Sequence, residues 1–156
     1  MSERRVNVEQ DASVRNSNSE ESRAIRTIKI QTEELGFQTN EAIKMLRANI
    51  QFSGYGMKAI AMTSCRANEG KSFVSFELAK SLAELGERTL YLDCDIRNSV
   101  AQARLGVTEK LPGLSDFLVG KAQIGDILCK TDVPHLHMIF AGSLSPNPAE
   151  LLSEDL

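Results

Sequence analysis

The feature that most constrains this 156-residue chain is the stretch Cys65–Ser72, which reads CRANEGKS. An apolar run, Ala59–Met62, ends two residues before it, and an amphipathic helical pattern begins at Lys71. A strand, a glycine-containing loop, Lys-Ser and a helix follow one another in this order in phosphate-binding P-loops. In such a loop the backbone N–H groups and the helix N-terminus attract phosphate oxygens. The sequence therefore predicts a P-loop, and a chance Gly-Lys-Ser at a helix start is the weaker interpretation.

Individual positions of the loop have separate expected roles. Lys71 is expected to reach the β- and γ-phosphates, and the Ser72 hydroxyl is expected to sit on Mg²⁺. Gly70 has no Cβ, so the backbone can approach the phosphates there. The residues expected to contact the nucleotide are Arg66, Ala67, Asn68, Glu69, Gly70, Lys71, Ser72 and Phe73.

The pattern after the loop predicts a βαβ unit. Residues 71 to 85 should form a helix that stops at Gly86. The residues of this helix expected to face the sheet are Phe73, Val74, Leu78, Leu82 and Leu85. Thr89–Leu92 reads as an apolar strand without alternation, which is typical of a strand covered on both faces. The strands before and after the helix should be parallel and joined by a right-handed crossover.

Two acidic residues follow the predicted strand at its carboxyl end. Asp93 and Asp95 are one residue apart, and Arg97 comes two residues later. In open α/β sheets, ligands bind at the carboxyl ends of the strands. Two carboxylates beside a P-loop can hold Mg²⁺ and orient an attacking hydroxyl. Acidic residues that only end a strand and cap a helix are the alternative, which the neighbouring Arg97 and P-loop make the weaker one.

The N-terminal residues 1–38 are polar and mixed in charge, a composition that predicts a flexible tail apart from a short extended piece around Ile28–Ile30. A helix is expected to start at Thr39–Asn40, which are good N-cap residues. Its apolar stripe consists of Ile43, Leu46 and Ile50, and a charged set on another face consists of Glu41, Lys44 and Arg47.

The overall composition limits the class of protein. A net charge of -3 and a pI near 5.5 give no reason to expect a nucleic-acid partner. The three cysteines contain no CxxC pair, which fits a reducing compartment. No apolar run approaches the ~20 residues that cross a bilayer. We therefore expect a soluble, cytoplasmic protein of one domain.

CRANEGKS combined with LYLDCDIRNS resembles the bacterial tyrosine kinases of capsule and exopolysaccharide synthesis. Asp93-x-Asp95-x-Arg97 after an apolar strand is similar to that family's second nucleotide motif, Walker A′. The resemblance runs from about Asn40 to the end of the chain, including Gly113-Leu114-Ser115 and the closing AGSLSPNPAELL. The helix at residues 41–47 resembles the family's Glu-x-x-Arg-x-x-Arg oligomerisation motif, with Lys44 in place of the first arginine.

The resemblance implies an α/β fold with a P-loop NTPase-like parallel sheet flanked by helices, formed by residues 39–156. It implies tyrosine autophosphorylation with ATP and Mg²⁺. Its implied partners are a membrane-bound polysaccharide co-polymerase that acts as activator and further copies of the chain, joined through the helix of Glu41, Lys44 and Arg47. It places the protein in the cytoplasm, recruited to the inner face of the membrane.

Site roles follow from the same resemblance. Lys71, Asp93, Asp95 and Arg97 are the implied catalytic residues, and Ser72, Asp93 and Asp95 are the implied metal ligands. Asp95 would accept or orient the tyrosine hydroxyl, and Arg97 would neutralise charge on the transferred phosphoryl group.

Family members continue past the Pro-Asn-Pro segment with an acidic strand end, Walker B, and a tyrosine-rich tail. Here the only tyrosines are Tyr55 and Tyr91, and the last predicted strand lies near His137–Phe140. We therefore expect an incomplete kinase domain with a sheet of about three strands, an open apolar edge and weak activity on its own. Two alternatives stay open: an ATPase switch of the septum-placement and plasmid-partition branch, whose signature lysine is replaced by Arg66, and a non-catalytic nucleotide-binding fragment.

Overall fold

The computed structural model describes residues 24–54, 56–66, 68–145 and 147–153. The prediction of a flexible tail at residues 1–23 and the assignments made for Tyr55 and Ala67 therefore lie outside the described residues.

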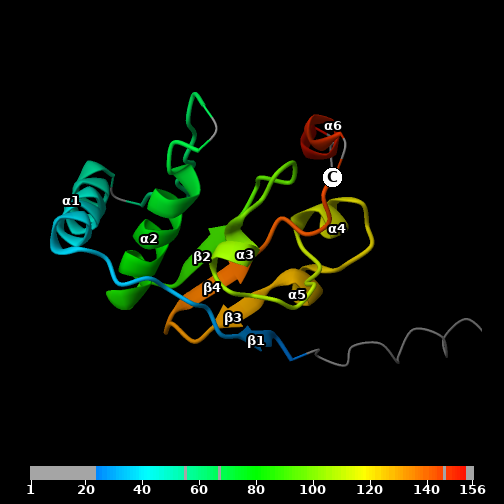
Figure 1. Ribbon diagram of the computed structural model, residues 1–156, viewed down its shortest axis with the longest axis horizontal. Coiled ribbons are helices and arrows are strands. Elements are labelled where there is room, and N and C mark those ends of the chain that lie inside the picture. The colour runs from blue at the N-terminus through cyan, green and yellow to red at the C-terminus, as the bar shows by residue number, and fades with distance from the viewer. Residues whose placement is uncertain (1–23, 55, 67, 146, 154–156) are drawn as a thin grey trace, which may run out of the picture.

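A four-stranded open sheet forms the centre of the fold (Figure 1). Its strands are β1 (Arg26–Ile28), β2 (Thr89–Leu92), β3 (Cys129–Thr131) and β4 (Leu136–Ile139), in the order β1-β3-β4-β2. β1 is parallel to β3 and β2 is parallel to β4, whereas β3 and β4 are antiparallel. The sheet is mixed, so the prediction of an all-parallel sheet was wrong in this detail. The connection at residues 132–135 is too short for the crossover that parallel neighbours require.

The helices are α1 (Phe37–Ser53), α2 (Lys71–Glu84), α3 (Ala101–Arg104), α4 (Leu114–Leu118), α5 (Ile124–Ile127) and α6 (Pro148–Ser153). α2 packs on β2, and α1 packs on α2 on the side away from the sheet (Figure 1). In the described part of the chain, no helix is both long enough and apolar enough to span a bilayer. The α/β class predicted from the sequence is confirmed.

The core lies between α2 and the face of the sheet that carries Tyr91. Phe76 of α2 meets the Tyr91 ring edge to face, with the ring centroids 5.8 Å apart. Met138 of β4 is fully buried in the same cluster, as is Phe140 just after that strand. This cluster fixes the position of α2, whose first residue is the P-loop lysine.

The predicted strand at residues 59–62 is absent from the structure, so the expected βαβ unit does not form. These residues belong to no helix or strand and are mostly exposed, with Ile60 at 43%. An extended segment becomes a strand only when a neighbouring strand supplies hydrogen-bond partners. None of the four described strands pairs with this segment. The apolar run gave the right composition for a strand and no information about its partner.

The prediction that β2 is covered on both faces was also wrong. Tyr91 is buried against α2, but Leu90 and Leu92 point to the opposite face and are 50% and 44% exposed. On α2, Phe76 rather than Leu85 carries the contact with the sheet, because the helix ends at Glu84 and leaves Leu85 half exposed. The predicted stop at Gly86 is confirmed by its φ of 90°.

The N-terminal region holds more structure than its composition predicted. β1 pairs with β3, and both Ile28 and Ile30 are buried in the core. The extended piece that was predicted around Ile28–Ile30 is therefore confirmed, and the predicted tail is wrong in its bounds because β1 begins at Arg26 and α1 at Phe37. α1 begins at Phe37 after Gly36, two residues before the predicted start. Of its predicted stripe, Ile43 is buried, and α1 as a whole packs on α2.

Candidate active site

The described part of the loop before α2 contains two residues in the left-handed backbone conformation. Gly70 adopts the left-handed conformation with φ of 88°, and Asn68 does the same with φ of 64°. The first helical hydrogen bond of α2 runs from the Val74 N–H to the Gly70 carbonyl, at 2.9 Å. The N–H groups that precede it, from Lys71 to Phe73, have no partner further back in the helix. They point toward the start of the helix, where an anion is favoured.

An acidic side chain already uses one of the loop N–H groups. The Arg66 N–H donates to Oε2 of Glu69 at 3.1 Å, and the Ser64 hydroxyl donates to the Arg66 carbonyl at 3.0 Å. The sequence interpretation counted Glu69 only as part of the nucleotide-contacting loop. In the structure its carboxylate accepts a hydrogen bond from the loop N–H of Arg66.

Asp93 begins the acidic loop after β2 and is almost completely buried, at 6% exposure. Its N–H donates to the Ile139 carbonyl at 2.9 Å, which continues the pairing of β2 with β4. Its Oδ1 accepts the Asp95 N–H at 3.0 Å, and its Oδ2 accepts the Ser99 hydroxyl. Both carboxylate oxygens of Asp93 therefore bind groups of its own loop.

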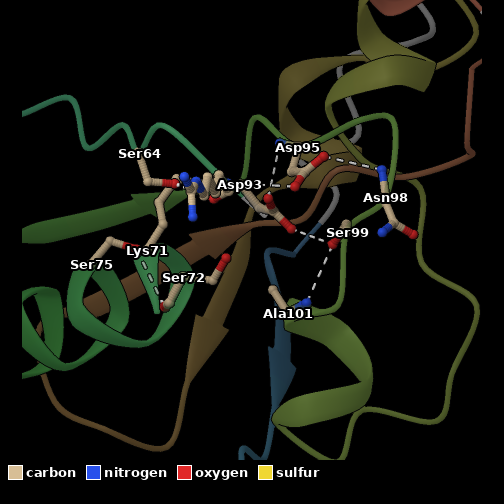
Figure 2. Close-up of polar contacts among 10 residues, drawn as sticks. Ser64, Lys71, Ser72, Ser75, Asp93, Asp95, Asn98, Ser99 and Ala101 are labelled. Carbon is tan, nitrogen blue, oxygen red and sulfur yellow. Dashed lines mark hydrogen bonds and ion pairs between the residues drawn. The ribbon is translucent and has the colours of Figure 1, made fainter. Parts of the chain in front are cut away.

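Asp95 is the acidic residue that faces the P-loop (Figure 2). Its Oδ2 lies 3.5 Å from Nζ of Lys71, and its Oδ1 accepts the Asn98 N–H at 3.0 Å. The side chains of Lys71 and Asp95 are each 35% exposed, so a ligand can reach both. The structure thus brings together the two residues that the sequence placed on a helix start and a strand end.

The other predicted site residues take no part in the ion pair between Lys71 and Asp95. Arg97 is exposed and does not join the Lys71–Asp95 pair. Ser72 lies half-buried in the first turn of α2, beside Lys71 (Figure 2). Phe73 is also half-buried, with the Arg104 guanidinium 4.6 Å from its ring centroid.

The donor set fits Mg²⁺ better than a metal held by protein alone. In the described residues, no group of three or more His, Cys, Asp or Glu side chains gathers as a metal cage. Magnesium usually keeps several waters and is bound by one or two carboxylates together with substrate phosphates. The Asp95 carboxylate and the Ser72 hydroxyl are suitable oxygen donors of this kind.

A third loop, residues 141–145, also reaches the site, and the sequence interpretation gave it no role. The Ser145 N–H donates to the carbonyl of Ile96, the residue that follows Asp95 in the chain, at 3.2 Å. Ser143 binds Asp116 of α4 through its N–H at 3.3 Å and its hydroxyl at 3.0 Å. Burial alone would raise the pKa of Asp116, but the hydrogen bonds from Gly113 and Ser143 lower it. The AGSLSPNP stretch is recognisable as a motif in the sequence, but its contact with Asp116 depends on the tertiary fold.

The predicted oligomerisation residues do not share one free face. Lys44 pairs with Glu41 at 2.9 Å on the exposed side of α1. Arg47 instead points to α2, where it donates to the Ser81 carbonyl at 3.0 Å and to the Ser81 hydroxyl at 2.8 Å. The assignment of Arg47 to an outward face is therefore corrected: this arginine joins α1 to α2.

A glycine loop that leads into α2, with an acidic loop at the carboxyl end of β2, defines the P-loop NTPase-like class of α/β folds. No family model matches the chain. Among curated proteins, the tyrosine-protein kinase CpsD of Streptococcus agalactiae is 46% identical over 115 residues, which cover 74% of this chain and 50% of that protein. CpsD of Streptococcus pneumoniae is 39% identical over 128 residues, with 81% and 56% covered.

The comparison with solved structures also finds bacterial tyrosine kinase domains. The BceF tyrosine kinase domain matches with a TM-score of 0.67 at 33% identity, covering 74% of this chain and 46% of that one. The kinase domain of the Escherichia coli tyrosine kinase ETK matches with a TM-score of 0.63 at 27% identity, with 78% and 51% covered. Over about three quarters of its length, the chain is therefore similar to bacterial tyrosine kinases of the CpsD type. It spans about half the length of the streptococcal relatives.

Proposed function

We propose that this chain is part of an ATP-dependent protein tyrosine kinase that phosphorylates itself and regulates capsular or extracellular polysaccharide synthesis. The observation that carries the proposal is the 3.5 Å approach of Lys71 to Asp95. A cation that can bind phosphate and a carboxylate that can accept a hydrogen bond from a hydroxyl therefore lie next to each other, and both are partly exposed. The names of the matched relatives support the choice of tyrosine as acceptor.

The chemistry follows from these two side chains. Lys71 binds the β- and γ-phosphate oxygens when it releases Asp95, and the N–H groups at the start of α2 bind further phosphate oxygens. Asp95 then accepts the hydrogen bond of a tyrosine hydroxyl and orients its oxygen toward the γ-phosphate. Phosphoryl transfer depends mainly on positioning and charge stabilisation, which these groups supply.

Mg²⁺ would supply charge neutralisation on the phosphate oxygens. Ser72 and Asp95 are the residues that would hold it. Asp93 is the less suited of the two acids, because its two oxygens already accept hydrogen bonds from Asp95 and Ser99. Arg97 is exposed in the same loop and is proposed to approach the phosphates when nucleotide is bound.

We propose partners and a location on the same basis. Further copies of the chain would dock on the outer side of α1, where Phe37, Met45 and Phe52 are exposed. These three side chains are spaced about two helical turns apart and therefore lie along one side of α1. A membrane-bound activator would recruit the protein from the cytoplasm to the inner face of the membrane.

The experiment that tests the proposed function is phosphotyrosine mapping after incubation with labelled ATP and Mg²⁺. The chain is compared with a fusion to the C-terminal half of the S. agalactiae CpsD relative, each with and without Asp95→Asn. We expect tyrosine labelling in the fusion that Asp95→Asn abolishes, and weak labelling by the chain alone. A fusion that binds ATP but labels no tyrosine, or labelling that survives Asp95→Asn, contradicts the proposal.

A further inference from the structure

The buried side chain of Asp93 binds the loop that carries Asp95. The Asp93 side chain is buried, and its Oδ1 fixes the Asp95 N–H at 3.0 Å. This contact sets the backbone from which the Asp95 carboxylate reaches Lys71. The orientation of the Asp93 carboxylate therefore decides where Asp95 lies.

One hydroxyl fixes the second oxygen of that carboxylate. Ser99 Oγ donates to Oδ2 of Asp93 and also accepts the Ala101 N–H at 3.3 Å (Figure 2). Ser99 thus connects the buried carboxylate to the first residue of α3. A buried carboxylate oxygen that loses its donor is costly, because no water replaces the hydrogen bond.

The other end of α3 is tied to the P-loop helix. Arg104, the last residue of α3, stacks over the ring of Phe73, with 4.6 Å between the guanidinium carbon and the ring centroid. Phe73 lies two residues after Lys71, in the first turn of α2. α3 therefore contacts both halves of the site: the acidic loop through Ser99 and the P-loop helix through Arg104.

We propose that Ser99 is a positioning residue for Asp95. It orients the Asp93 carboxylate, which in turn holds the Asp95 N–H. The proposal rests on the proposed function in that Asp95 acts on a bound magnesium nucleotide. The contacts of Ser99 within the loop do not depend on that function.

The first test measures hydrogen exchange in the chain without ligand. Three variants are compared with the parent: Ser99→Ala, the hydroxyl-restoring Ser99→Thr, and Ser53→Ala, which removes a hydroxyl that binds the Asn49 carbonyl at the end of α1. Loss of one hydrogen bond should speed the exchange of the Asp95 amide about fivefold in Ser99→Ala. Exchange in β4 should stay unchanged, and Ser99→Thr should return the Asp95 amide toward the parent rate. An unchanged Asp95 amide in Ser99→Ala overturns the proposal.

The second test measures ADP binding by calorimetry with Mg²⁺ and with EDTA. Asp95 contributes to binding only when Mg²⁺ is present, whereas Lys71 and the loop N–H groups bind phosphate in either condition. Ser99→Ala should therefore raise the Kd of Mg·ADP about fivefold and leave the Kd in EDTA unchanged. Equal weakening in both conditions means that Ser99 supports the fold only, which overturns the positioning role. If the parent binds no ADP, the proposed function fails, and the exchange experiment alone decides the role of Ser99.

Discussion

The Lys71 ammonium and the Asp95 carboxylate lie 3.5 Å apart, although they come from the start of α2 and from the loop after β2. Each side chain is about one-third exposed, and an exposed pair of this kind contributes little to folding stability. The pair therefore matters for its position in the site and not for folding stability. A cation and a carboxylate are held ready at the point where the two loops meet, and a polyphosphate can separate them.

The close contact between the loop of Gly113 and the loop of Gly142 is predicted to tolerate no added side chain. Gly142 has φ of 81°, and a Cβ there would meet Oδ2 of Asp116 at 2.6 Å and Cα of Gly113 at 2.8 Å. Gly142→Ala should lower the free energy of unfolding by about 1–3 kcal/mol. Urea denaturation measures this change. Gly125→Ala is the matched control, because a Cβ at Gly125 meets nothing within 4 Å, and a loss as large in this control would contradict the steric explanation.

Glu77 should make stability depend on pH in a defined direction. Burial raises the pKa of Glu77, and the nearby Lys80, 3.9 Å away, offsets only part of this effect. The folded state then holds the proton more tightly than the unfolded chain. Stability from this group is therefore present below the ordinary value of 4.5 and is lost as pH rises through the higher folded pKa.

Glu77→Gln removes this titration. The difference in free energy of unfolding between variant and parent should grow in favour of the variant as pH rises above about 4.5. Denaturation at a series of pH values from acidic to neutral measures it. A difference that stays constant with pH would show that burial does not raise the pKa of this carboxyl.

The exposed side of α1 should control assembly. Phe37 and Phe52 are 80% and 90% exposed on this helix, and Met45 lies between them. Replacing Met45 and Phe52 by serine should convert a larger species to monomer in light scattering, because an apolar contact between copies would lose its buried area. Leu85→Ser, at a half-exposed leucine just after α2, is the control. A parent chain that is already monomeric at micromolar concentration contradicts the proposed interface.

The local parts of the site could be predicted from the sequence. Lys71 and Asp95 belong to short motifs, and both motifs carry their own structural context: a helix start in one case and a strand end in the other. Because helix starts and the carboxyl ends of strands lie at the same edge of an α/β sheet, their meeting follows from local patterns. The stop of α2 at Gly86 is equally local, since it needs only a left-handed residue.

The remaining parts depend on tertiary partners that residue patterns do not reveal. The apolar run at Ala59–Met62 has the composition of a strand but no described partner strand. Arg47 has helical spacing with Glu41, yet it turns inward because Ser81 of α2 offers it two acceptors. The burial of Asp93 beneath its own loop was likewise not visible in an Asp-x-Asp pattern.

The central claim, that Lys71 and Asp95 form the two sides of one magnesium-nucleotide site, is tested most directly by calorimetric titration of the chain with ADP. The parent is compared with Lys71→Ala and Asp95→Asn, with and without Mg²⁺, after circular dichroism has shown equal folding. The account predicts that Lys71→Ala abolishes binding in both conditions, whereas Asp95→Asn removes only the part of the affinity that depends on Mg²⁺. Binding that is equal in all three proteins, or a Mg²⁺ dependence that survives Asp95→Asn, would contradict it.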